Sequence, residues 1–255
     1  MTDLFDLSGR LALVTGASRG LGRLFATTLA QAGARVVIHG RDTAALATTA
    51  DAIAGVTGVT PAQITFDVRD AAQVEEGVSS VLKEHGTPDI LVNSAGVQRR
   101  APIHEFPVAD WDDVIATNLN GTFYVCRFVA PAMVARGSGK IVNIASVQSA
   151  LARQTIAPYS ASKGGIVQLT KGMAADLARF NIQVNAISPG YFATDMNSAL
   201  VEDEAFTAWL VNRTPARRWG DVGELAGALL YLCSDASSFV SGQNIFVDGG
   251  MTAVV

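Results

Sequence analysis

The sequence of 255 residues is poor in the side chains that bind metals. It contains two cysteines, Cys126 and Cys233, which stand far apart and form no Cys-x-x-Cys motif. Its three histidines, His39, His85 and His104, fall on different predicted elements and show no metal-ligand spacing. We therefore expect no catalytic metal, and we expect both thiols to be buried as small apolar side chains.

Long hydrophobic runs and an excess of positive charge are also missing. No apolar run approaches the roughly 18 residues of a membrane span, and the amino terminus lacks a basic segment leading into an apolar signal core. Charged residues make up 16% of the chain and the formal net charge is −4, which argues against a nucleic-acid-binding surface. These absences predict a cytoplasmic protein that binds neither membranes nor nucleic acids.

Short apolar runs alternate with longer helical patterns along the whole chain. This alternation is typical of an α/β fold with parallel strands. We expect a single Rossmann-type, doubly wound parallel sheet of about seven strands, with helices on both faces. No linker divides the chain, so residues 1–255 are expected to form one domain. The expected strands are residues 11–15, 35–39, 62–66, 89–93, 139–144, 182–188 and 244–247.

A glycine-rich turn follows the first apolar run and leads into a helical pattern. In its sequence TGASRGLG, Gly16 permits a tight turn, Gly20 lets the backbone approach a pyrophosphate, and Gly22 lets the helix pack closely on the strand. Amide groups at the start of the helix attract an anion. The motif predicts a site for dinucleotide phosphates, although taken alone it is also compatible with a plain tight connection.

A second motif, YSASK, contains Tyr159 and Lys163, and Ser146 stands thirteen positions before the tyrosine. In a helix, a separation of four residues places both side chains on one face. A lysine ammonium there favours the phenolate and so lowers the tyrosine pKa, which makes Tyr159 a candidate acid and base for carbonyl chemistry. Taken alone, such a pair more often lies on a solvated helix face, so the interpretation depends on the glycine turn.

Together these motifs resemble the short-chain dehydrogenase/reductase family, whose marks are TGxxxGxG near the start and YxxxK after a serine. Asn93-Ser-Ala-Gly96 is similar to the family's NNAG element, with serine in place of the second asparagine. The resemblance spans nearly the whole chain and implies one dinucleotide-binding and catalytic domain. It implies hydride transfer between a nicotinamide and a secondary alcohol or ketone, coupled to proton transfer at oxygen. The catalytic residues it implies are Asn118, Ser146, Tyr159 and Lys163, with Asn118 anchoring a water beside the lysine.

The cofactor can be argued from the residue after the second strand, where an acidic side chain would favour NAD. This chain instead has Gly40 followed by Arg41, with Arg19 in the glycine turn, and two guanidinium groups could clamp a 2′-phosphate, so we expect NADP. The alternative is that both arginines are solvated and that Asp42 reaches the ribose. Asp67 resembles the family aspartate beside the adenine, although it is also placed to cap the next helix. The expected cofactor contacts are Gly16, Ser18, Arg19, Gly20, Leu21, Gly22, Arg41, Asp67, Val68, Asn93, Ala95, Gly96, Tyr159, Lys163, Pro189, Gly190, Phe192 and Thr194.

Segments outside the cofactor motifs, such as VQRR at 97–100 and SVQS at 146–149, resemble family members that act on sugar acids. This resemblance implies interconversion of gluconate and 5-ketogluconate. Arginines would pair with a carboxylate, and a glutamine would donate to and accept from sugar hydroxyls. The expected substrate contacts are Arg100, Ser146, Gln148, Arg153 and Tyr159.

Two other functions remain open. A 3-oxoacyl-carrier-protein reductase would share every core motif, and its acidic partner would need a basic docking patch, for which Arg99, Arg100, Arg217 and Arg218 are candidates. A cofactor-binding scaffold without turnover would share the fold, although the intact serine, tyrosine and lysine speak against it.

Two expectations concern parts of the chain beyond the catalytic motifs. Residues 191–215 interrupt the alternation of strands and helices and are expected to form a lid over the substrate. The resemblance also implies a homotetramer, in which the long helices around 107–135 and 157–180 pair across subunits.

Overall fold

The structure, a computed structural model, describes residues 4–194 and 197–255. Across these residues, seven strands form one parallel sheet in the order β3-β2-β1-β4-β5-β6-β7. Every expected strand is present, with ends within two residues of the prediction. The strands are β1 (Leu11–Thr15), β2 (Arg35–His39), β3 (Ala62–Ile64), β4 (Ile90–Asn93), β5 (Gly139–Ile144), β6 (Ile182–Pro189) and β7 (Asn244–Val247).

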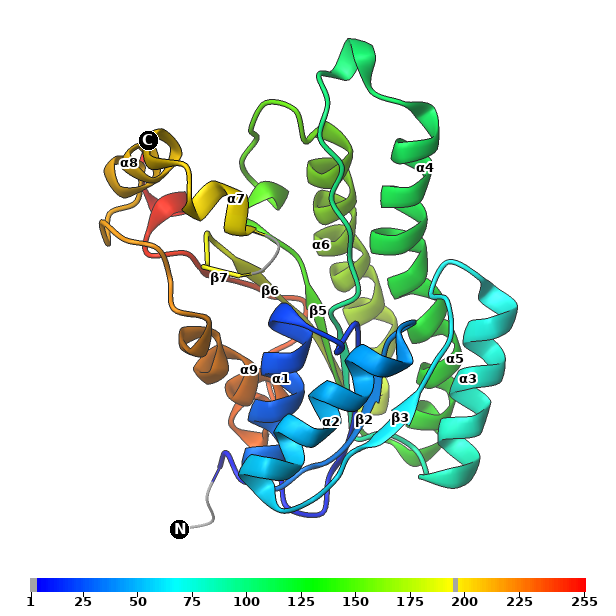
Figure 1. Cartoon of the computed structure of the whole chain (residues 1–255). Helices are drawn as coiled ribbons and strands as arrows, with labels where there is room; N and C mark the ends of the chain where they lie inside the picture. Colours follow the sequence, from blue (N-terminus) through cyan, green and yellow to red (C-terminus); the bar gives the residue numbers. More distant parts are fainter. Residues whose placement is uncertain (1–3, 195–196) are drawn as a thin grey trace.

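Helices cover both faces of the sheet (Figure 1). One face packs against α1 (Gly20–Gln31), α2 (Thr43–Thr57) and α9 (Ala226–Cys233). The other packs against α3 (Ala71–Glu84), α5 (Gly121–Arg136) and α6 (Ala157–Leu177). This doubly wound arrangement confirms the expected fold. The other helical segments are η1 (Ile103–Glu105), α4 (Val108–Ile115), the π-helical η2 (Ala116–Asn120), η3 (Val147–Ser149), η4 (Ala178–Phe180), α7 (Ser198–Val201), α8 (Glu204–Arg213), η6 (Val222–Leu225), η7 (Asp235–Ser237) and η8 (Met251–Ala253).

Alternate residues of each central strand supply two separate cores. In β1, Ala12 and Val14 face the core that contains Phe25 of α1, whereas Leu13 faces the core that contains Val129 of α5. All of these side chains are buried, because a parallel sheet with helices on both faces leaves neither face to solvent. This explains why the strands appear in the sequence as continuous apolar runs.

The strand order reverses between β1 and β4, and this point opens a crevice at the carboxyl edge of the sheet. The Thr15 hydroxyl, at the end of β1, accepts from the backbone nitrogens of Ser94 (3.2 Å) and Ala95 (3.4 Å) after β4. Gly16 follows with φ +66°, and a Cβ there would lie 2.6 Å from the Ala95 Cα. Only glycine allows this close contact.

Both thiols are buried, as the sequence analysis predicted. Cys126 lies on α5, where burial raises its pKa to about 12 although Asn93 Nδ2 donates to its sulfur at 3.2 Å. Cys233 ends α9, and burial also raises its pKa well above the ordinary value. Neither thiol is therefore a nucleophile in the folded chain.

Within residues 4–194 and 197–255, no three His, Cys, Asp or Glu side chains stand close enough together to hold a metal ion. In the same residues, no helix has the length and apolar character required to cross a bilayer.

Candidate active site

A pocket of about 590 Å³ lies at the carboxyl edge of the sheet, between the glycine turn and the segment after β6. Its volume suits a small-molecule site. Among the described residues that line it there is no aspartate or glutamate, whereas six cationic side chains line it, so it is suited to anionic ligands. These are Arg19, Arg41, Arg99, Arg100, Arg153 and Lys163.

The glycine turn occupies one wall of this pocket and has the features of a phosphate cradle. Helix α1 begins at Gly20, and its N-cap Arg19 forms no side-chain capping hydrogen bond with the described residues. The first amides of the helix are therefore available to an anion. A Cβ on Gly20 would meet no atom within 4 Å, whereas a Cβ on Gly22 would collide with the backbone of Gly16. These glycines keep the turn tight on its inner side and open toward a ligand.

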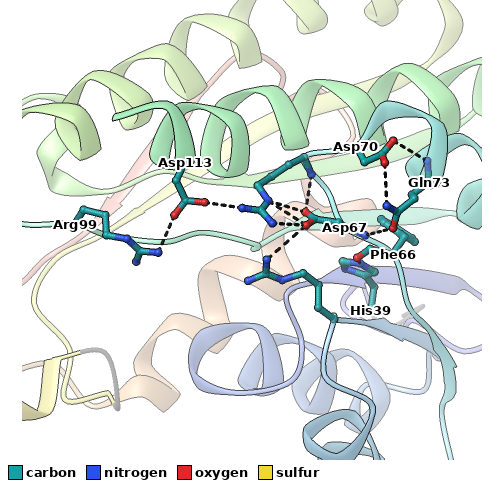
Figure 2. Close-up of polar contacts among 9 residues, drawn as sticks. His39, Phe66, Asp67, Asp70, Gln73, Arg99 and Asp113 are labelled. Atoms are coloured by element: carbon teal, nitrogen blue, oxygen red, sulfur yellow. Dashed lines mark hydrogen bonds and ion pairs between the residues drawn. The ribbon is translucent and has the colours of Figure 1, made fainter. Parts of the chain in front are cut away.

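His39, the last residue of β2, holds this turn and was not identified from the sequence. Its Nδ1 accepts from the Gly16 nitrogen at 3.4 Å. Its Nε2 lies 2.9 Å from the Phe66 carbonyl oxygen (Figure 2). Burial lowers the pKa of His39 to about 4, so its ring is neutral and carries its proton on Nε2. The sequence offered no signal for this role, because the bond joins the end of β2 to the turn that follows β1.

The residues after β2 fit a 2′-phosphate on the adenosine ribose. Arg41 and Arg19 both line the pocket, and the Arg41 side chain is 57% exposed. The competing candidate, Asp42, does not line the pocket; its carboxylate caps α2 by accepting from the nitrogens of Ala44 and Ala45, each at 3.0 Å. Positive rather than negative charge therefore faces the ligand here.

Two expected cofactor contacts, Asp67 and Asn93, do not line the pocket. The Asp67 carboxylate is bound by Arg69, which contacts both of its oxygens. The Asn93 side chain points into the fold and donates to Asn143 Oδ1 at 2.9 Å. All other expected cofactor contacts do line the pocket.

Ser146, Tyr159 and Lys163 converge in the pocket, as their spacing predicted. Helix α6 carries Tyr159 and Lys163 on one face, and the lysine Nζ lies 5.6 Å from the centre of the tyrosine ring. Ser146, just after β5, lines the same pocket, and its hydroxyl accepts from the Gln148 nitrogen at 3.2 Å. Lys163 Nζ itself donates to the carbonyl oxygen of Ile144 at 2.6 Å.

The expected fall in the pKa of Tyr159 is not found. Burial raises the pKa of Tyr159, the hydrogen bond from Ser146 opposes this rise, and the nearby Tyr191 adds to it. Burial also lowers the pKa of Lys163 to about 8. The physical reason is that both groups are desolvated and the ammonium is directed at the Ile144 carbonyl oxygen.

The depressed pKa of Lys163 has a consequence for stability. The unfolded chain protonates this lysine below its ordinary pKa of 10.5 and the folded chain only below about 8, so stability rises with pH between these values. We expect Lys163 to add up to about 3 kcal/mol to the unfolding free energy from pH 8 to pH 10.5, at about 1.4 kcal/mol per pH unit. Urea unfolding of the cofactor-free wild type and Lys163→Met measures this difference. Parallel pH profiles of the two proteins would contradict the burial of the ammonium.

Asn118, the fourth expected catalytic residue, lies in the π-helical turn η2 and does not line the pocket. Its Oδ1 accepts from the Val97 nitrogen (2.8 Å), and its Nδ2 donates to the Val97 carbonyl oxygen (3.0 Å) and to Ser162 Oγ (3.0 Å). The Ser162 hydroxyl in turn donates to the Tyr159 carbonyl oxygen at 2.8 Å. Asn118 therefore ties the loop after β4 to the helix that carries the tyrosine.

The expected substrate contacts gather at the other end of the pocket. Arg100 and Arg153 both line it, and burial together with the neighbouring Arg153 lowers the pKa of Arg100. Gln148 Nε2 donates to the Tyr191 hydroxyl at 3.4 Å. Two buried polar atoms here, Gln148 Oε1 and Arg153 Nε, have no hydrogen-bond partner among the described residues. An unpaired acceptor and an unpaired donor thus remain for a ligand.

Tyr191 lines the pocket and belongs to an aromatic cluster that the sequence analysis did not recognise. Its ring lies near those of Phe206, Trp209 and Trp219, at centroid distances of 5.6, 6.2 and 6.0 Å. Arg153 lies over the Phe206 ring at 5.2 Å. In the expected lid, residues 195 and 196 lie outside the described residues, and α7 and α8 follow them.

Sequence comparison identifies the class of protein. A family profile described as enoyl-(acyl carrier protein) reductase matches residues 16–252. The chain belongs to the short-chain dehydrogenase/reductase family.

Three relatives are similar over nearly the full length. Gluconate 5-dehydrogenase of Gluconobacter oxydans (strain 621H) is 54% identical over 250 residues, which are 98% of this chain and 97% of the relative. The 5-keto-D-gluconate 5-reductase of Escherichia coli (strain K12) is 50% identical over 255 residues, all of both chains. The crystal structure of a gluconate 5-dehydrogenase from Burkholderia cenocepacia J2315, in complex with NADP and tartrate, has a TM-score of 0.96 at 52% identity and covers 99% of each chain.

Proposed function

We propose that this protein is an NADP(H)-linked oxidoreductase that interconverts a secondary alcohol and a ketone of a sugar acid, with gluconate and 5-ketogluconate as the pair. The observation that carries the proposal is the pair of pocket arginines, Arg100 and Arg153, beside an unpaired glutamine oxygen. A carboxylate suits the arginines, and a hydroxyl donor suits Gln148 Oε1. Relatives that are at least half identical carry this activity in their names.

The proposed chemistry at oxygen belongs to Tyr159 and Ser146. When bound, NADPH supplies the hydride for the substrate carbon. In reduction, Tyr159 donates its phenolic proton to the ketone oxygen, and in oxidation the phenolate accepts that proton back. The Ser146 hydroxyl, which lines the same pocket, donates to the same substrate oxygen and orients it. Lys163 lines the site beside the tyrosine, with its Nζ 5.6 Å from the centre of the ring.

One further residue, Asn118, supports this reaction by its position. Asn118 fixes the loop after β4 through both backbone groups of Val97, and it also holds Ser162 on α6. We assign its role to placing α6 and anchoring a water near Lys163. The proposed unit of function is a single domain of residues 1–255, in which residues 191–215 cover the substrate.

NADP fits the adenosine end of the pocket, where Arg19 and Arg41 provide positive charge and no described lining residue is acidic. The Burkholderia relative binds NADP. That relative also binds tartrate, a hydroxylated dicarboxylate, which supports an anionic, hydroxyl-bearing substrate here.

The alternative of a 3-oxoacyl-carrier-protein reductase is less favoured by the surface charges. Its docking patch would need free arginines, but Arg99 is paired with Asp113 at 2.7 Å and Arg218 with Glu224 at 2.6 Å. A carrier protein would have to compete with these carboxylates. The carboxylate partners therefore favour the small-molecule substrate.

A direct comparison of substrates tests the proposal. With NADPH, we expect 5-ketogluconate to be reduced with a kcat/KM at least about 100-fold above that of an acetoacetyl thioester, because only the sugar acid offers a carboxylate and hydroxyls. Nicotinamide absorbance measures both rates. A preference for the thioester would identify the carrier-protein reductase instead, and binding of nucleotide without turnover of any ketone would identify a scaffold.

We also propose a cytoplasmic homotetramer. Helices α4 and α5 expose apolar side chains, with Val108 at 74%, Trp111 at 38% and Phe123 at 46% exposure. Exposed apolar surface of this kind is typical of subunit contacts. Light scattering measures the mass in solution, and a monomer mass would contradict the assembly.

A further inference from the structure

A chain of alternating charges runs beside the adenosine end of the pocket (Figure 2). It begins at Arg41, after β2, and continues through Asp67 and Arg69, which follow β3. Arg69 Nη1 then reaches Asp113 of α4 at 2.9 Å, and Asp113 binds Arg99, after β4, at 2.7 Å. The two ends of this chain, Arg41 and Arg99, line the pocket, whereas its three inner members do not.

Arg69, and not Arg41, is the main partner of Asp67. Arg69 Nε lies 3.0 Å from each carboxylate oxygen, its Nη2 lies 2.6 Å from Oδ2, and its backbone nitrogen donates to Oδ1 at 3.0 Å. This bidentate geometry is the strong form of an arginine–carboxylate pair. The same bond is the main reason why the pKa of Asp67 falls to about 2, so the carboxylate is ionised at every working pH.

Arg41 is held much more loosely by the same carboxylate. Its Nη1 lies 3.5 Å from Asp67 Oδ2, and among the described residues this is its only ion pair. Its side chain is 57% exposed. Without Arg69, the Asp67 carboxylate would have its full charge available to bind Arg41. It would also repel any anionic group of a ligand that approached Arg41.

We propose that Arg69 is a specificity-determining residue for the 2′-phosphorylated cofactor that acts without touching it. By occupying Asp67, it leaves the Arg41 guanidinium available for the 2′-phosphate and cancels the negative charge nearest to that group. This inference rests on the proposed use of NADP. It makes Arg69 a positioning residue that acts through Arg41.

The experiment measures binding of two nucleotides, 2′,5′-ADP and 5′-AMP, by isothermal titration calorimetry on the full chain. They share the adenine and differ in the 2′-phosphate, so their affinity ratio reports the phosphate site alone. In Arg69→Gln we expect the affinity for 2′,5′-ADP to fall about ten-fold while that for 5′-AMP changes by less than about two-fold. Arg41→Ala is expected to lower the same ratio directly.

A second variant separates this role from a general effect on folding. In Asp67→Asn combined with Arg69→Gln, no carboxylate remains to bind Arg41, so the wild-type ratio is expected to return. The matched control is Arg10→Gln, which removes an arginine whose Nη2 contacts both carboxylate oxygens of Asp235, a residue outside the pocket lining, and is expected to leave the ratio unchanged. Thermal unfolding of each variant confirms that the proteins are folded.

The outcomes distinguish this inference from the assignment of the cofactor. A wild type that prefers 2′,5′-ADP, with an Arg69→Gln variant that keeps the same ratio, would overturn the role of Arg69 and leave NADP in place. Failure of the double variant to recover the ratio would also overturn it. Equal binding of both nucleotides by the wild type would overturn the NADP assignment and this inference together.

Discussion

Replacement of Tyr159 by phenylalanine is expected to lower kcat for the reduction of 5-ketogluconate by about 10³-fold, within the range observed when a proton donor is removed. The ring stays in place between Ser146 and Lys163, but no phenolic proton is left for the ketone oxygen. The affinity for NADPH is expected to change by less than about two-fold, because the substitution removes one oxygen and no charge. Nicotinamide absorbance gives the rate and calorimetry gives the affinity.

Tyr231→Phe is the matched control for this experiment. Tyr231 lies on α9 and does not line the pocket, so losing its hydroxyl is expected to leave turnover at the wild-type level. Near-normal turnover by Tyr159→Phe, with the control also normal, would assign the proton transfer to another group.

Replacement of Arg153 by methionine is expected to lower kcat/KM for 5-ketogluconate about 100-fold, mainly through KM. Arg153 lines the pocket, its Nε has no partner among the described residues, and Arg100 faces the same space. Loss of a charge-assisted bond to a carboxylate removes binding energy that is present in both the ground state and the transition state. Methionine keeps the contact with Phe206 while removing the charge.

An uncharged ketohexose and a second arginine provide the controls. If Arg153 binds the carboxylate, its replacement changes the rate with the uncharged ketose by less than about three-fold. Arg99→Met removes an arginine that is already paired with Asp113. This substitution is expected to lower kcat/KM for 5-ketogluconate much less than Arg153→Met does. If Arg153→Met lowers kcat/KM equally for the charged and the uncharged substrate, Arg153 has a role in packing instead.

The sequence was sufficient for the fold because the parallel strands are buried on both faces. Each strand therefore stands out as an apolar run, and the polar helix faces between them complete the alternation. The order of motifs also located most of the pocket, since the carboxyl ends of the strands meet at one edge. Ser146 lies there because it follows β5, and the four-residue spacing of Tyr159 and Lys163 places both on one face of α6.

The sequence was less informative where a role depends on a partner from another element. Asp67 stands at the expected end of a strand, but Arg69 determines where its carboxylate points. Asn93 ends a buried strand with its side chain toward Asn143, and no local pattern gives that direction. The pKa of Tyr159 is raised mainly by burial, and spacing along a helix carries no information about burial. Tyr191 was missed because its aromatic neighbours come from later segments of the chain.

The two sheltered sulfurs give the protein an internal reporter. Alkylation requires a thiolate that the reagent can reach. In the folded chain both Cys126 and Cys233 are buried and burial raises their pKa values, so neither thiol reacts. Iodoacetamide should consequently modify the chain only during excursions that open α5 or α9, so the rate of carbamidomethylation follows those openings residue by residue. Because the cysteines lie on opposite faces of the sheet, mass spectrometry of the two peptides tells whether both layers detach together.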